Sequence, residues 1–136
     1  MENCKPMSTP IAQDEKLTSS EDVEKLDESS YRSLVGCLLY LKTSKPDIMF
    51  VVSLLSRVMY CCNVNHYKVA KRVLRYMRET LDHGVKFMRI ERVKLLGYSD
   101  SDWDGSSEDM KSTSGYFFTL GSSAFYWSSK KQKTIA

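Results

Sequence analysis

The sequence predicts an α+β protein, with helices in its first part and a small antiparallel β-sheet in its second. Two observations carry this prediction. Between about residues 31 and 80, apolar residues recur at spacings of three and four, which is the period of an α-helix. After Gly84 the pattern changes to short apolar and aromatic stretches separated by Gly and polar residues, which is typical of strands joined by turns. We therefore divide the chain into residues 1–82 and 83–136.

The first 28 residues are predicted to be an extended leader. Pro6 and Pro10 oppose a helix there, and the acidic stretch from Asp14 to Glu28 has no apolar stripe.

Charge is distributed unevenly along the chain. Residues 1–30 carry eight acidic and three basic side chains, residues 31–82 carry three and nine, and residues 83–136 carry six and eight. A basic middle behind an acidic leader indicates a polyanionic partner, and a solvated helix face is the alternative.

Three helices are predicted, over about residues 31–42, 46–60 and 65–80. Each is preceded by Ser or Asn residues whose side chains can accept a hydrogen bond from the first turn. The expected capping residues are Ser29 or Ser30 for the first helix, Ser44 with Asp47 for the second, and Asn63 or Asn65 for the third. The second helix is apolar on nearly every side, so it must be buried. Gly84 is expected to end the third helix.

The third helix carries five basic side chains opposite its apolar positions. They are Lys68, Lys71, Arg72, Arg75 and Arg78, with no acidic residue between them. Such a row suits contacts with the phosphates of a nucleic acid, although a merely solvated helix face also fits these residues. The two histidines that flank the helix, at positions 66 and 83, are expected to be structural or exposed rather than catalytic.

The second part of the chain predicts an antiparallel β-meander. Its expected elements are a β-type stretch from Val85 to Met88, a turn at Glu91-Arg92, a strand over 95–102, a polar loop over 104–114, a strand over 115–120, a turn at Gly121-Ser122 and a strand over 124–128.

The segment Y-S-D-S-D-W-D-G, residues 98–105, is the cluster that could support metal chemistry. In a strand, Asp100 and Asp102 project from the same face, and carboxylate oxygens are ligands for hard divalent cations. Two-metal phosphoryl chemistry needs further ligands from other elements. The other acidic residues nearby are Asp104, Glu108 and Asp109. A solvated acidic turn is the alternative interpretation.

Four cysteines, at positions 4, 37, 61 and 62, form no C-x-x-C motif. We expect them to be reduced thiols of an intracellular protein, in the cytoplasm or the nucleus. The acidic beginning of the chain is unlike a signal peptide, and the most apolar run, residues 48–55, is too short to span a bilayer. No membrane partner is expected.

Several motifs together resemble one family. They are M-E-N-C-K-P-M-S-T-P (1–10), Y-R-S-L-V-G-C-L-L-Y-L (31–41), K-P-D-I (45–48), L-S-R (55–57), H-Y-K-V-A-K-R-V-L-R-Y (66–76), G-Y-S-D-S-D-W-D-G (97–105), K-S-T-S-G-Y (111–116) and W-S-S-K-K-Q (127–132). In this order they resemble the Pol polyprotein of copia-type retrotransposons.

The resemblance implies that residues 1–82 are the C-terminal part of a reverse transcriptase and residues 83–136 a truncated N-terminal part of an RNase H-like domain. The meander would then be the start of an RNase H-like fold. Asp100 matches the first catalytic carboxylate, which binds Mg²⁺ in the parent enzyme. The other catalytic carboxylates would follow Ala136. We therefore expect an incomplete site that holds no Mg²⁺ tightly, and a chain that is catalytically inactive alone.

The expected partners are an RNA–DNA hybrid or other nucleic acid, bound weakly, and a full-length Pol chain. The alternative function is a small non-enzymatic nucleic-acid-binding module that uses the basic helix 66–79.

Overall fold

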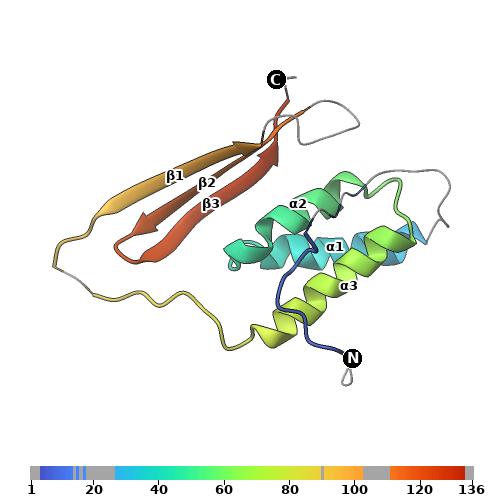
Figure 1. The fold of residues 1–136 in the computed structure, drawn as a ribbon, viewed down its shortest axis with the longest axis horizontal. Helices are drawn as coiled ribbons and strands as arrows, with labels where there is room; N and C mark the ends of the chain where they lie inside the picture. The colour runs from blue at the N-terminus through green and yellow to red at the C-terminus, as the bar shows by residue number, and fades with distance from the viewer. Residues whose placement is uncertain are drawn as a thin grey trace. The chain divides into compact units, whose positions relative to one another are not determined.

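The structure is a computed structural model that describes residues 4–13, 15, 17, 27–89, 91–102 and 111–133, with only the backbone of Asp102. It divides into two compact units, Met1–His83 and Gly84–Ala136, and each is described by itself. The first unit is helical and the second contains a three-stranded antiparallel sheet, so the α+β prediction is confirmed (Figure 1). Within the described residues, no helix combines the length and apolar character needed to cross a membrane.

Helix α1, Glu28–Leu41, is capped by Asp27. Its carboxylate accepts hydrogen bonds from the backbone N–H of Ser29 at 3.3 Å and of Ser30 at 3.2 Å. The Ser30 hydroxyl also donates to it at 3.0 Å, and these bonds lower the pKa of Asp27, the side-chain bond most. The predicted cap, Ser29 or Ser30, is therefore wrong. Asp27 caps the helix instead, and its negative charge also complements the positive end of the helix dipole.

The second predicted helix is two elements, the 3₁₀ turn η1 (Pro46–Ile48) and helix α2 (Met49–Arg57). The expected capping pair of Ser44 and Asp47 is wrong. The Ser44 hydroxyl donates back to the carbonyl of Leu41 at 3.1 Å. Asp47 instead accepts a hydrogen bond from the hydroxyl of Tyr76, which lies 29 residues further along the chain. Asp47 therefore serves long-range packing and not a local cap.

The turn η1 is tied to the end of helix α3, Val64–Glu79. The Tyr76 hydroxyl donates to Asp47 Oδ2 at 2.7 Å. Next to it, Lys45 Nζ donates to the Thr80 carbonyl at 3.0 Å. A cation at the carbonyl end of a helix satisfies an unpaired acceptor and opposes the negative end of the helix dipole. The K-P-D-I motif thus joins two elements separated by about thirty residues of chain.

Helix α3 begins with a capping box built from Asn63 and His66. Asn63 Oδ1 accepts from the His66 backbone N–H at 3.0 Å, and His66 Nδ1 accepts from the Asn63 backbone N–H at 3.3 Å. Asn63 is therefore the cap rather than Asn65, and the structural role expected for His66 is confirmed. The prediction that Gly84 ends the helix is wrong, because Thr80 already closes it with bonds to the carbonyls of the last turn.

The three helices lie side by side (Figure 1), and their buried side chains form one apolar core. Its buried members are Tyr31, Val35, Leu38, Ile48, Val51, Val52, Leu55, Val58, Cys62, Val69, Ala70 and Val73. The Tyr31 hydroxyl, inside this core, donates to the Leu55 carbonyl at 3.0 Å and so satisfies its own polar atom. Helix α2 is buried as expected where Val51, Val52 and Leu55 face this core, whereas the side chain of Phe50 on the same helix remains 46% exposed.

The second unit is a meander of β1 (Leu95–Asp102), β2 (Thr113–Leu120) and β3 (Ser123–Lys131). The strands pair antiparallel in the order β1-β2-β3. Gly121, with φ of 65°, makes the predicted turn between β2 and β3. The strand predicted over 95–102 is confirmed.

Two details of the predicted sheet are wrong. Strands β2 and β3 extend beyond their apolar residues, because polar positions such as Thr113 and Lys131 still pair across the ladder. The β-type stretch from Val85 to Met88 is not a strand. Within this stretch, the carbonyl of Lys86 accepts a hydrogen bond from the side-chain hydroxyl of Ser123 and not from the backbone of a neighbouring strand.

Candidate nucleic-acid interface

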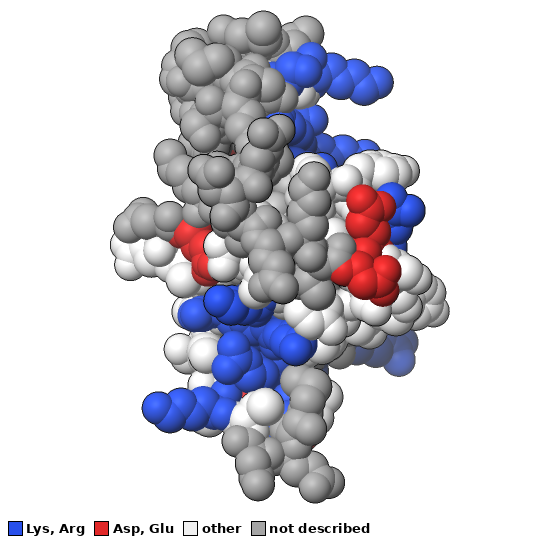
Figure 2. Space-filling view, turned by 90° about the vertical axis from the view of Figure 1, so that its right-hand side faces the viewer, with Lys and Arg blue, Asp and Glu red and all other residues white. Residues whose placement is uncertain are grey.

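Helix α3 separates an apolar side from a basic side. His66, Val69, Ala70 and Val73 are buried against the other helices. The five basic residues predicted as a nucleic-acid site lie on the remaining positions, and their exposure differs. Those with exposed side chains are Lys68, Lys71 and Arg78, and those that are half-buried are Arg72 and Arg75. On the face drawn in Figure 2, Lys and Arg side chains form several patches, and acidic side chains lie directly beside some of them.

Arg72 and Lys71 make contacts within the chain that bear on this surface. Arg72 Nε donates to the Thr9 carbonyl at 3.2 Å, and its Nη2 donates to Thr9 Oγ1 at 2.9 Å. This pair fixes the leader against α3. Lys71 Nζ lies 4.5 Å from the centre of the Tyr67 ring, a cation–π contact that leaves the ammonium at the surface. Arg72 therefore has a structural role beside any role in binding.

Arg75 differs from the other four. Its Nε atom is buried and has no hydrogen-bond partner. A buried donor without an acceptor typically costs about 1–3 kcal/mol.

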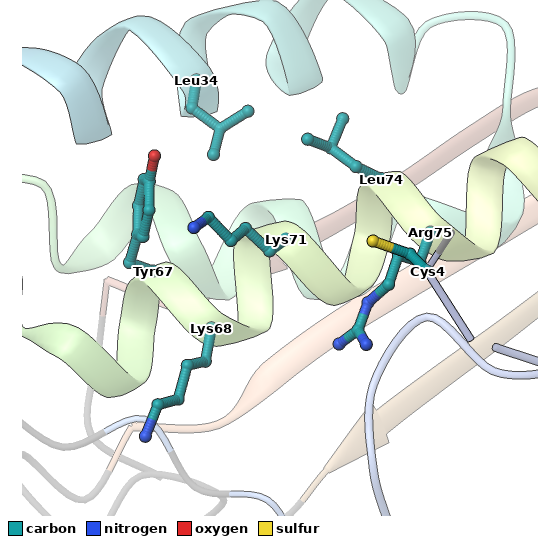
Figure 3. A pocket seen from close by; sticks show the side chains of 7 residues that line it. All are labelled: Cys4, Leu34, Tyr67, Lys68, Lys71, Leu74 and Arg75. Atoms are coloured by element: carbon teal, nitrogen blue, oxygen red, sulfur yellow. The ribbon is translucent and has the colours of Figure 1, made fainter. Parts of the chain in front are cut away.

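A pocket of about 490 Å³ opens beside these residues (Figure 3). Its apolar lining comes from Leu34 of α1 and from Tyr67 and Leu74 of α3. Its cationic lining comes from Lys68, Lys71 and Arg75, and the leader contributes Cys4. Figure 3 shows the Lys71 ammonium directed toward the Tyr67 ring, and shows Lys68 and Arg75 extending away from α1. An apolar floor with cations around it suits an anion that carries an apolar group.

Asp100 lies on β1, away from the basic helix in sequence and on the other unit. Its side chain is exposed and its cross-strand partner is Gly115. The side chain of Asp102, and all of Asp104, Glu108 and Asp109, lie outside the described residues. Across the described part of the chain, no three His, Cys, Asp or Glu side chains gather in a way that could hold a metal ion. Of this predicted acidic cluster, the structure therefore describes the side chain of Asp100 alone.

Comparison with known proteins identifies the family. The sequence is 41% identical over 135 residues to the retrovirus-related Pol polyprotein from transposon RE2 of Arabidopsis thaliana, covering 99% of this chain and 9% of that protein. It is 36% identical over 143 residues to the Pol polyprotein from transposon TNT 1-94 of Nicotiana tabacum, covering 100% of this chain and 11% of that protein. The chain belongs to the copia-type retrotransposon Pol family.

The chain spans about a tenth of the length of these Pol polyproteins. It is also 43% identical over 107 residues to the secreted RxLR effector protein 161 of Plasmopara viticola, covering 78% of this chain and 75% of that protein. No protein-family model matches the sequence, and no solved structure matches it significantly.

Several Pol-like motifs found in the sequence meet in the helical unit. Thr9 of the first motif contacts Arg72, Tyr31 contacts the carbonyl of Leu55, and Asp47 contacts Tyr76. Each contact joins two different motifs. Their spacing in this segment of Pol is therefore set partly by packing, which the motifs alone do not reveal.

Sequence reasoning missed the pocket as a site. Leu34 and Leu74 are visible in the sequence as members of apolar helix faces, and Lys68 and Lys71 as members of the basic row. Nothing in the sequence joins them to Cys4, which is more than sixty residues away from Lys68. The signal that existed was Tyr67, an aromatic residue placed among the cations of α3.

Proposed function

We propose that the chain is the Pol segment that joins the end of the reverse transcriptase, residues 1–82, to the start of the RNase H domain, residues 83–136. We propose further that it contacts nucleic acid through α3 and catalyses no reaction by itself. The order of its motifs supports the first statement. In the parent polyprotein the activities would be RNA-directed DNA synthesis and cleavage of RNA in an RNA–DNA hybrid.

The basic side of α3 carries this proposal. Lys68, Lys71 and Arg78 are exposed on it, and the half-buried Arg75 adds a further positive charge. The helix contains no acidic residue before Glu79 to neutralise these charges. A row of cations on a rigid helix releases counterions from a nucleic acid when it contacts the phosphates. Binding through α3 should therefore weaken steeply as salt is added.

The absence of catalysis follows from the metal chemistry of the parent. Hydrolysis of a hybrid by two Mg²⁺ ions requires several carboxylates that hold the ions about 3.5–4 Å apart. By resemblance, Asp100 is the residue of this sequence that matches such a ligand. One carboxylate cannot place two ions, so we expect a polypeptide of these 136 residues to bind Mg²⁺ weakly at most.

The test is incubation of the purified chain with a labelled RNA–DNA hybrid in Mg²⁺ and then in Mn²⁺, with Asp100→Asn in parallel. We expect no cleavage in either metal. We also expect binding that falls sharply between about 50 and 200 mM salt. Cleavage that disappears in Asp100→Asn would overturn the proposed lack of catalysis.

A charge-matched pair of variants tests the role of α3. Lys68→Gln with Arg78→Gln should make the dependence of the binding constant on salt concentration less steep. The change should correspond to the loss of about two phosphate contacts. Lys94→Gln with Lys133→Gln removes two exposed charges outside α3 and should change it little. Equal effects of the two pairs would show that binding is spread over the surface.

Two further parts of the proposal concern the surroundings of the chain. We infer an intracellular location, in the cytoplasm or the nucleus, and the four free cysteine thiols support it. We also keep a full-length Pol chain as a proposed partner. The exposed aromatic residues of the sheet, such as Tyr98 and Tyr126, support such an association.

A further inference from the structure

We propose that the pocket beside α3 takes up one unpaired nucleotide of a single-stranded nucleic acid. The base would lie among Leu34, Tyr67 and Leu74, and the neighbouring phosphates would contact the cations of the helix. This inference deepens the proposed function and rests on it, because it names the form of nucleic acid that α3 prefers.

The apolar part of the pocket fits a base. Leu34 and Leu74 face each other from α1 and α3, and Tyr67 adds an aromatic ring that is only half-buried (Figure 3). The volume of about 490 Å³ lies within the range of sites that enclose small organic molecules. Aromatic rings contact bases of every kind, so such a site is tolerant of sequence.

The cationic part fits the phosphates on either side of that base. Lys71 lies 4.5 Å from the Tyr67 ring centre, so positive charge and ring surface are adjacent, as phosphate and base are in a nucleotide. Lys68 and Arg75 extend away from α1, in a different direction from Lys71 (Figure 3). They can therefore reach other phosphates of the same strand. Arg75 also lines the pocket, so its guanidinium adds a third cation beside the proposed strand.

The same geometry excludes a base that is paired and stacked. In a duplex the flat faces of the bases are covered by their neighbours, so no base can enter between Leu34 and Tyr67 without being unstacked. A fatty acid would fill the apolar part but would offer one carboxylate to three cations. A nucleic acid strand offers a phosphate at every nucleotide, which matches the charge of the site better.

The experiment compares two oligomers of equal length and charge, one of thymidines and one of abasic deoxyribose units, with the full chain. An RNA–DNA hybrid serves as the duplex probe. We expect the thymidine oligomer to bind about tenfold more tightly than the abasic oligomer. Tyr67→Leu, which keeps an apolar residue on the helix, should remove most of this preference and weaken hybrid binding much less.

Two charge variants complete the test. Arg75→Gln should weaken both oligomers more than Arg78→Gln does, because Arg78 does not line the pocket. Thermal unfolding of each variant verifies that α3 is intact. Equal binding of the thymidine and abasic oligomers, with hybrid binding retained, would overturn the pocket proposal and leave the proposed function standing. Failure to bind any of the three probes would overturn both.

Discussion

The helical unit and the sheet use their apolar residues in different ways. Every buried apolar residue of the described chain lies between Tyr31 and Val73, in the helical unit. In the sheet, Tyr98 is 57% exposed and Tyr126 is 55% exposed, and aromatic rings contact one another along the surface instead. The helical unit is therefore stabilised by a core, and the sheet by cross-strand pairs. Substitutions should separate these two kinds of stability.

The largest effect is expected from a cavity in the core. Leu38 is fully buried, so Leu38→Ala should lower the free energy of unfolding of the helical unit by about 2–5 kcal/mol. Leu95→Ala makes the same chemical change on β1, where the side chain is 61% exposed, and should cost less than about 0.5 kcal/mol. Urea unfolding followed by far-ultraviolet circular dichroism measures the helices, and tryptophan fluorescence measures the sheet, where Trp127 lies on β3. Similar losses in the two variants would contradict the comparison.

A second prediction concerns the sheet, where Gly97 lies beneath the ring of Phe118. A Cβ atom at Gly97 would lie 2.7 Å from Phe118 Cε1, which is closer than atoms can approach. Gly97→Ala should therefore destabilise the sheet by about 1–3 kcal/mol and leave the helices unaffected. Trp127 lies on β3, so tryptophan fluorescence follows the unfolding of the sheet.

Phe118→Leu provides the control for this prediction. In that background the added methyl group has room, so Gly97→Ala should cost clearly less than it does alone. An unchanged cost in the double variant would mean that glycine is needed at this position for its backbone and not for the ring above it.

A third prediction uses the cap of α3. Asn63→Ala removes a side-chain acceptor from the capping box and should cost about 1 kcal/mol. Asn65→Ala is the matched control, because Asn65 is exposed and lies inside the helix. Thermal unfolding of the two variants gives the difference. Equal midpoints would show that the capping bonds contribute nothing.

The same two asparagines show how far the sequence could lead. Apolar periodicity predicted three helices and the alternation after Gly84 predicted the sheet, because these patterns record which side of an element is buried. The choice between Asn63 and Asn65, or between Asp27 and Ser29, depends on backbone angles that no local pattern records. Thr9 meets Arg72 only after the leader folds back on α3, so this contact and the pocket could not be predicted.

The smallest effect is expected at the contact between η1 and α3. The hydrogen bond from Tyr76 to Asp47, together with burial, raises the pKa of Tyr76 from 10.0 to about 12. Because the folded state holds this proton more tightly than the unfolded state, the contribution is complete below pH 10 and is lost as the pH rises toward 12. It should amount to less than about 1 kcal/mol, since the contact is at the surface. Tyr76→Phe should therefore unfold more easily than the natural chain at pH 8, and the gap should close in strong base. Tyr40→Phe, at a position that is 79% exposed, should leave the midpoint unchanged throughout. A gap for Tyr76→Phe that stays constant with pH would show that the hydroxyl stabilises the turn by packing and not through its proton.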